Sequence, residues 1–67
     1  MDEFLKNAED EAYEMYEKLS IEYDDLENIT DEDESEDAYN LVDNYHEATD
    51  ALYDLYWAIK NYRENRS

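Results

Sequence analysis

Apolar residues in the first half of the chain recur at alternating intervals of three and four positions. The series is Leu5, Ala8, Ala12, Met15, Leu19 and Leu26, and it is interrupted once, where Glu22 stands in place of an apolar residue. This spacing puts the apolar side chains on one side of an α-helix, in which a turn holds about 3.6 residues. The pattern therefore predicts an amphipathic helix over about residues 2–28.

The second half repeats this spacing without an interruption. Its apolar series is Ala38, Leu41, Tyr45, Ala48, Leu52, Leu55, Ile59 and Tyr62. The average period is about 3.5 residues, which predicts a second amphipathic helix over about residues 37–64. Val42, Thr49 and Tyr56 widen the apolar side of this helix beyond a single line of contact.

An acidic segment between the two series continues neither of them: Thr30-Asp31-Glu32-Asp33-Glu34-Ser35-Glu36-Asp37. Thr30, Asp31 and Ser35 are each suited to cap a helix, because their short side chains accept hydrogen bonds from free backbone N–H groups. We place a turn at about residues 29–36. Two helices joined so briefly are expected to fold back on each other, so the sequence predicts an all-α antiparallel two-helix hairpin forming one domain, residues 1–67.

The core of such a hairpin is small, because both apolar series include alanines and the chain has 67 residues. Below roughly 70–80 residues a single core contributes little stability. The additional strip of Val42, Thr49 and Tyr56 offers a contact for a second copy. We therefore expect a homodimer in which two hairpins form a four-helix bundle.

The composition adds a very large negative charge. The chain has 22 Asp and Glu against 5 Lys and Arg, which gives a formal charge of −17. Such a charge is also typical of disordered chains, but the regular apolar spacing favours a folded protein. The sequence has no Cys and no apolar run approaching the roughly 18 residues of a membrane span, so we expect a cytoplasmic protein without a membrane segment.

The acids fall on the sides of the predicted helices that face away from the apolar series. They are Asp10, Glu14, Glu17 and Asp24 on the first helix, and Asp43, Glu47, Asp50 and Asp54 on the second. Successive carboxylates in such a row lie roughly 4.5–6 Å apart along the axis, so they repel one another and lower the stability of the helix. Selection for stability alone is expected to place lysines among them.

The density of these acids approaches that of nucleic acid. Residues 1–36 hold 16 acids, about one per 3 Å of helix. Duplex DNA carries about one negative charge per 1.7 Å. A protein surface that binds phosphates is therefore expected to attract this chain, and the alternative is an acidic protein whose charge only keeps it soluble.

Several pieces of the chain resemble the Ocr family of phage antirestriction proteins. They are Asp10-Glu11-Ala12-Tyr13-Glu14-Met15, Tyr23-Asp24-Asp25-Leu26, Asp37-Ala38 and Asp43-Asn44, in the same order as in the N-terminal half of that family. Members of the family are acidic, helical, dimeric DNA mimics that occupy the DNA-binding groove of type I restriction-modification enzymes. The resemblance, over about residues 10–44, implies the same role here and implies that five residues imitate phosphates: Asp10, Glu14, Asp24, Asp25 and Asp43.

No catalytic or metal-binding set is found in the sequence. A calcium-binding EF-hand loop begun at Asp31 would need Gly in place of Glu36 and Glu in place of Val42. His46 is the only histidine, and without Gly or Cys neither a phosphate-cradling loop nor a cysteine nucleophile can form. We expect neither an enzyme nor a bound cofactor or metal.

The aromatic residues, eight tyrosines and Trp57, are expected mainly to fill the core. Trp57 falls on the acidic side of the second helix, where it is either a partner or dimer contact or a ring lying over its own helix. His46 is expected to pack beside Tyr39 and Tyr53 of the same helix. A hydrophobic patch that contacts a partner or a second copy is predicted at Val42, Tyr56 and Trp57.

The acidic rows favour a DNA mimic that inhibits a host defence enzyme, a type I restriction-modification or CRISPR complex, by occupying its DNA-binding site. The partner would be a basic DNA-binding protein of the host, and we expect no direct binding of nucleic acid. An alternative is a protein-specific inhibitor, such as an antitoxin, immunity protein or transcription regulator, that relies on the hydrophobic patch. A third is an acidic chaperone-like buffer for basic proteins. The residues expected to imitate phosphates are Asp10, Glu14, Glu17, Asp24, Asp25, Asp43, Glu47, Asp50 and Asp54.

Overall fold

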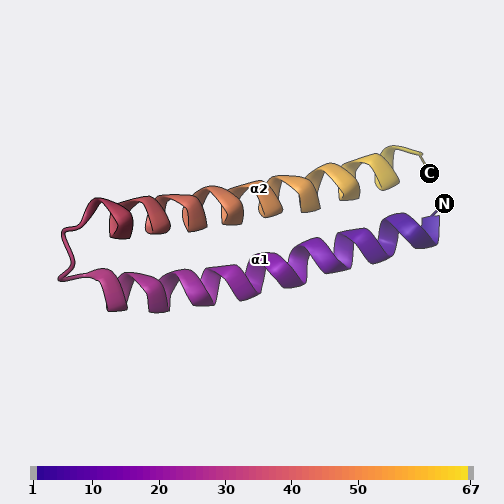
Figure 1. The fold of residues 1–67 in the computed structure, drawn as a ribbon. Coiled ribbons are helices and arrows are strands. Elements are labelled where there is room, and N and C mark those ends of the chain that lie inside the picture. Colours follow the sequence, from indigo (N-terminus) through magenta and orange to yellow (C-terminus); the bar gives the residue numbers. More distant parts are fainter. Residues whose placement is uncertain (1, 67) are drawn as a thin grey trace.

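The computed structural model describes residues 2–66, with Arg66 described by its backbone alone, and this range contains two helices and no strand. Helix α1 spans Asp2–Thr30 and helix α2 spans Glu36–Arg66. The helices lie side by side and antiparallel, so both ends of the chain lie at the same end of the molecule (Figure 1). The prediction of an all-α hairpin is confirmed. Helix α1 ends two residues later than predicted, and α2 begins one residue earlier and ends two residues later than predicted.

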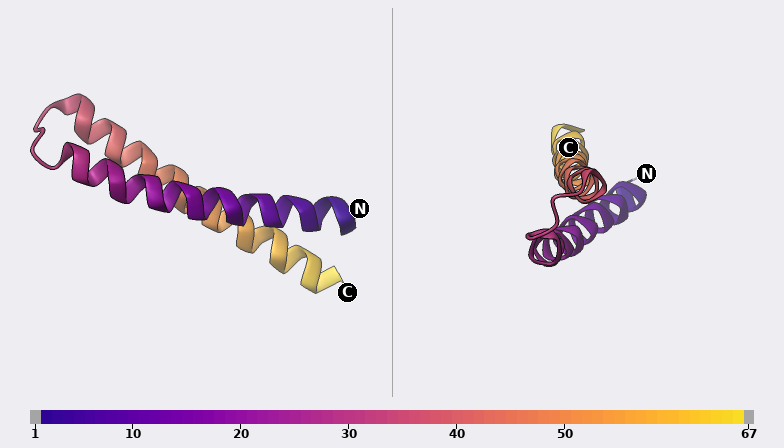
Figure 2. Two further views of the ribbon diagram at one scale, coloured as in Figure 1. Left: turned by 90° about the horizontal axis from the view of Figure 1, so that it is seen from below. Right: turned by 60° about the vertical axis from the view of Figure 1, so that its left-hand side comes forward.

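The molecule is a rod. Its Cα atoms extend over 50 × 15 × 13 Å, and the two helix axes cross near the middle of the rod and diverge toward its ends (Figure 2). We call the end with the turn the turn end and the end with the two chain termini the open end. This shape follows from the long uninterrupted helices, since the chain has neither Gly nor Pro to break them.

Ser35 caps α2. The backbone N–H of Ala38 donates to Ser35 Oγ at 3.2 Å, and the N–H of Ser35 donates to Asp33 Oδ1 at 2.9 Å. The Ser35 N–H and then its hydroxyl lower the pKa of the Asp33 carboxyl. Thr30, another of the three predicted caps, instead ends α1, where its hydroxyl donates to the carbonyl oxygen of Leu26 at 2.8 Å.

Three ring contacts between the helices set their register. As the position on α1 rises, the position of its partner on α2 falls by the same number of residues, as antiparallel pairing requires. The ring centroids are 5.0, 5.1 and 5.8 Å apart in the pairs Tyr13–Tyr56, Tyr16–Tyr53 and Tyr23–His46, respectively.

The residues between the helices follow a seven-residue repeat, as in a coiled coil. On α1 the buried and half-buried positions of this repeat are Leu5, Glu9, Ala12, Tyr16, Leu19, Tyr23, Leu26 and Thr30. On α2 they are Ala38, Val42, Tyr45, Thr49, Leu52, Tyr56, Ile59 and Arg63. The core is thin, because Ala12 and Ala38 are the only buried hydrophobic residues in the described part of the chain.

Half of the apolar series predicted for α2 is wrong. Leu41 and Leu55 are exposed, as are Ala48 and Tyr62, while Val42 and Tyr56 lie between the helices with Thr49. Both sets have the same period and differ only by a small rotation of the helix about its axis, so the spacing fits either one. On α1, in the same way, Tyr16 replaces Met15 between the helices.

Candidate partner-binding surface

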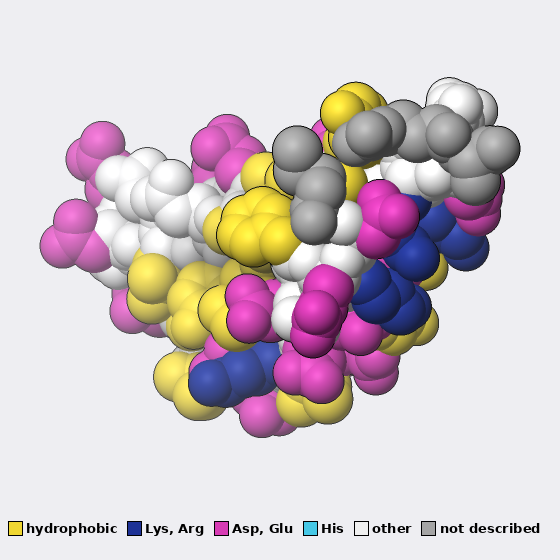
Figure 3. All heavy atoms as spheres, turned by 90° about the vertical axis from the view of Figure 1, so that its right-hand side faces the viewer, with side chains coloured by type: hydrophobic (Ala, Val, Ile, Leu, Met, Phe, Trp, Pro, Cys, Tyr) yellow, Lys and Arg dark blue, Asp and Glu magenta, His cyan; other side chains and the backbone are white. Residues whose placement is uncertain are grey.

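The nine carboxylates predicted to imitate phosphates are all exposed: Asp10, Glu14, Glu17, Asp24, Asp25, Asp43, Glu47, Asp50 and Asp54. They lie on the outer side of each helix because their positions in the seven-residue repeat face away from the residues between the helices. The outer sides of two packed helices point in opposite directions. The structure therefore gathers these residues in two rows on opposite sides of the rod. Seen from the open end, Asp and Glu side chains project at several places around the outline, and Lys and Arg side chains gather mainly on one side (Figure 3).

The charges are unevenly divided along the rod. Residues 19–49, which form the turn half, contain 12 Asp and Glu and no Lys or Arg. Residues 1–18 and 50–67 contain the other 10 acids and all 5 Lys and Arg, and we call residues 2–18 and 50–66 the open half. A cationic partner meets no repulsive charge over the turn half.

Two of the nine carboxylates lie beside a nitrogen of a basic side chain. Lys6 Nζ lies 3.2 Å from Asp10 Oδ1, and His46 Nδ1 lies 3.4 Å from Asp50 Oδ2. Asp10, and after it Glu9, raises the pKa of the Lys6 ammonium. Within residues 2–65 the other seven make no ion pair, so their charges remain available to a partner.

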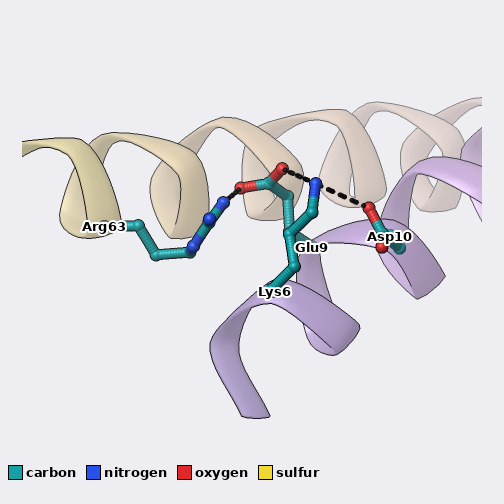
Figure 4. Close-up of polar contacts among 4 residues, drawn as sticks. All are labelled: Lys6, Glu9, Asp10 and Arg63. Carbon is teal, nitrogen blue, oxygen red and sulfur yellow. Dashed lines mark hydrogen bonds and ion pairs between the residues drawn. The ribbon is translucent and has the colours of Figure 1, made fainter. Parts of the chain in front are cut away.

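A buried glutamate holds the open end of the rod together (Figure 4). Arg63 Nη1 donates to Glu9 Oε1 at 2.6 Å, and Lys6 Nζ lies 3.4 Å from Glu9 Oε2. Burial alone would raise the pKa of the Glu9 carboxyl, but Arg63 and Lys6 together lower it below its usual value. This carboxylate is therefore a structural group and not part of the outer rows.

The structural role of Glu9 was not predicted from the sequence, although its position in the apolar series indicates it. It stands four residues after Leu5 and three before Ala12, which places it in the line of residues between the helices. A charge at such a position requires a partner, because an unpaired carboxylate is costly to bury. Arg63 holds the matching position on α2, seven residues after Tyr56.

Aromatic rings cover one side of the hairpin. Trp57 makes edge-on contacts with Tyr53 and Tyr56 of its own helix, with centroids 6.2 and 5.6 Å apart, and the Lys60 ammonium lies 5.0 Å from its ring. The indole remains 39% exposed. Trp57 therefore packs over its own helix within the hairpin, and its contact with a partner or a second copy stays a prediction.

The hydrophobic patch predicted at Val42, Tyr56 and Trp57 is not continuous in the hairpin. Val42 and Tyr56 are half-buried between the helices, and Trp57 alone among the three is exposed. The ring of His46 packs against Tyr23 of α1, and its expected place beside Tyr39 and Tyr53 stays a prediction. The rotation of α2 described above accounts for the positions of Val42 and Tyr56.

A groove of about 620 Å³ lies at the open end and is lined by Lys6, Lys60, Arg63 and acidic residues that include Glu9. Among the described residues, no group of His, Cys, Asp or Glu is arranged to hold a metal ion. None of the helices described combines the length and the apolar character that crossing a membrane requires.

Comparison with known proteins identified no relative of the chain. No protein-family model, no curated protein and no solved structure matches the chain. The resemblance to the Ocr family therefore stays a hypothesis that rests on the quoted residues, and the function is argued from the charges and their positions.

Proposed function

We propose that the protein is a DNA mimic that inhibits a DNA-binding enzyme of host defence, a type I restriction-modification or CRISPR complex, by occupying its DNA groove. One observation carries the proposal. All nine carboxylates expected to imitate phosphates are exposed on the outer sides of two rigid helices, and the turn half contains no Lys or Arg.

The charge density supports this role. The chain carries −17 over a rod 50 Å long, whereas duplex DNA of that length carries about 29 negative charges. The rod thus reaches more than half the linear charge of DNA. A groove lined with Lys and Arg would release its bound counterions on contact with the protein, as it does with DNA.

The arrangement of the rows fits a groove better than a flat surface. Two helices packed side by side are roughly 18–22 Å across, from an axis separation of about 8–10 Å and a helix diameter of about 10–12 Å. A concave cationic surface that closes around the rod can reach both rows at once. The mechanism is occupancy, so no chemical step is needed.

Competition with DNA tests the proposal. The purified protein is titrated into a type I restriction-modification enzyme, and separately into a CRISPR effector, each bound to fluorescent duplex DNA. We expect displacement of the DNA from at least one of them, and a loss of affinity on the order of a hundredfold between 50 and 200 mM salt for about four phosphate-like contacts. If the protein displaces DNA from neither of the two enzymes, the proposal is overturned.

The salt dependence of the binding affinity also distinguishes the DNA mimic from the second candidate function, a protein-specific inhibitor. A protein-specific inhibitor would bind through apolar contacts, and its affinity would change little between the two salt concentrations. Trp57, 39% exposed, is the residue of the predicted patch that remains available for such contacts.

We further propose that the protein acts as a homodimer, which the thin core of the single hairpin supports.

A further inference from the structure

Five aromatic rings from both helices form a continuous cluster in the open half of the rod. We define the aromatic cluster as Tyr13, Tyr16, Tyr53, Tyr56 and Trp57, in which neighbouring ring centroids are 5.0–6.2 Å apart. Tyr13, Tyr53 and Trp57 are 41%, 42% and 39% exposed, respectively. Three members of the cluster therefore keep surface open to a partner.

One cation already lies on this cluster. The Lys60 ammonium is 5.0 Å from the ring centroid of Trp57 and 5.8 Å from that of Tyr56. At distances up to about 6 Å, the negative face of an aromatic ring attracts an ammonium or a guanidinium. Within residues 2–65 Lys60 makes no ion pair, in contrast to Lys6 and Arg63. The two rings, and not a carboxylate, therefore hold its charge.

Each exposed ring of the cluster has a carboxylate of the proposed binding surface beside it. The pairs are Asp10 with Tyr13, Asp50 with Tyr53 and Asp54 with Trp57. The members of each pair are three positions apart, and such residues are neighbours on the surface of a helix. A flat cation that stacks on one of these rings can therefore also donate its N–H groups to a carboxylate.

We infer that the rings of Trp57 and Tyr56 form a binding site for an arginine side chain of the partner, and that Lys60 occupies this site in the free protein. The guanidinium is flat, stacks on ring faces and is more weakly hydrated than an ammonium, so it leaves water for the rings more readily. The inference rests on the proposed function, because Arg is a common phosphate-binding residue of DNA grooves. It adds the type of side chain that is recognised.

Lys60 has a second position available when an arginine takes its place. It lines the groove of about 620 Å³ at the open end together with Asp2 and Glu64. Glu64 follows Lys60 by four residues, so the two are neighbours on the surface of α2. The displaced ammonium therefore keeps carboxylates close to it. The rings thus favour a partner whose cation binds them better than an ammonium does, which selects arginine over lysine.

Peptides of eight arginines or eight lysines test this selection, because they have equal length and charge. Each peptide carries fluorescein and is titrated with the protein while its anisotropy is followed. We expect wild type to bind the arginine peptide about three- to tenfold more tightly than the lysine peptide, and Trp57→Leu to lose most of this difference.

Phe4→Leu is the matched control for Trp57→Leu. Phe4 is an aromatic residue that is 71% exposed and, among the described residues, has no ring contact with the cluster. This variant should keep the preference of wild type. Equal affinity of wild type for the two peptides, or a preference that Trp57→Leu leaves unchanged, would overturn the site.

Removal of Lys60 tests its role as the resident cation. Lys60→Ala leaves all five rings in place and should bind the arginine peptide about three- to tenfold more tightly than wild type. Lys18→Ala removes the same charge from an exposed position outside the cluster and should strengthen binding by less than about twofold. Equal gains would show that Lys60 acts only through net charge. Both variants keep Trp57, so this comparison decides the matter even if Trp57→Leu does not fold.

The peptide assays and the DNA competition assay separate this inference from the proposed function. If wild type displaces DNA from neither enzyme but shows both peptide effects, the DNA mimic is wrong and the arginine site remains. If it displaces DNA but shows neither peptide effect, the arginine site is wrong and the DNA mimic remains.

Discussion

The guanidinium of Arg63, near the end of α2, donates a 2.6 Å hydrogen bond to the carboxylate of Glu9, near the start of α1. The two residues are 54 positions apart in the sequence and meet at the open end of the rod. No covalent connection holds the helices together there, in contrast to the turn end. Glu9 is also the only buried charged residue in the described part of the chain. The contact therefore links the two helices and also gives the buried carboxylate the cationic partner that it requires.

Replacing Arg63 should destabilise the fold. In Arg63→Met the Glu9 carboxylate stays buried with Lys6 as its only cationic neighbour, and we expect the free energy of unfolding to fall by about 1–3 kcal/mol. Urea denaturation followed by circular dichroism measures the difference. Lys18→Met is the matched control, because it removes the same charge from an exposed position on α1. An equal effect of the two substitutions would show that Arg63 acts only through net charge.

The same contact predicts a dependence of stability on pH. Arg63 and Lys6 outweigh burial and lower the pKa of Glu9 in the folded protein below the ordinary value of 4.5. Its ionised form therefore stabilises the fold above pH 4.5, and this contribution disappears as the pH falls through the lowered folded value. We expect wild type to be more stable than Glu9→Gln at pH 7 and to lose that advantage as the pH falls from 4.5 through the lowered folded value.

Thermal unfolding of the two proteins between pH 3 and pH 7 measures this advantage. Glu11→Gln, an exposed neighbour on α1, provides the control for the general effect of removing one negative charge. A constant difference between wild type and Glu9→Gln over the whole range would contradict the lowered pKa.

The hairpin could be predicted from the sequence because its determinants are local. Apolar residues at intervals of three and four give two helices, and a run of acids with good capping residues gives the turn. The choice of Ser35 over Thr30 as the cap could not be made, because either hydroxyl can accept from a backbone N–H. The rotation of α2 could not be predicted for a similar reason, since Leu41 and Val42 both fit the period and the choice depends on packing against α1.

The outer carboxylates could be predicted for the same local reason as the helices. A residue opposite the interhelical line stays exposed even after a small rotation, so Glu14 and Asp54 face solvent with either apolar series. The contact of Glu9 with Arg63 required knowledge of the register between the helices, which the spacing along one helix does not contain.

The position of the acids, and not only their number, should determine partner binding. A row variant carries Asp43→Asn, Glu47→Gln, Asp50→Asn and Asp54→Asn, which empties the outer side of α2. We expect it to bind the DNA-binding enzyme at least a hundredfold more weakly than wild type, because about four phosphate-like contacts are lost. Its free hairpin should be more stable, since repulsion along the helix is relieved. The DNA competition assay and urea denaturation measure these two effects.

A turn variant with the same charge is the control for the row variant. Asp31→Asn, Glu32→Gln, Glu34→Gln and Asp37→Asn also remove four negative charges, but they leave both outer rows intact. This variant should retain most of the affinity of wild type for the enzyme. If the two variants lose affinity equally, net charge alone drives binding, and the acidic chaperone-like buffer becomes the better description of the protein.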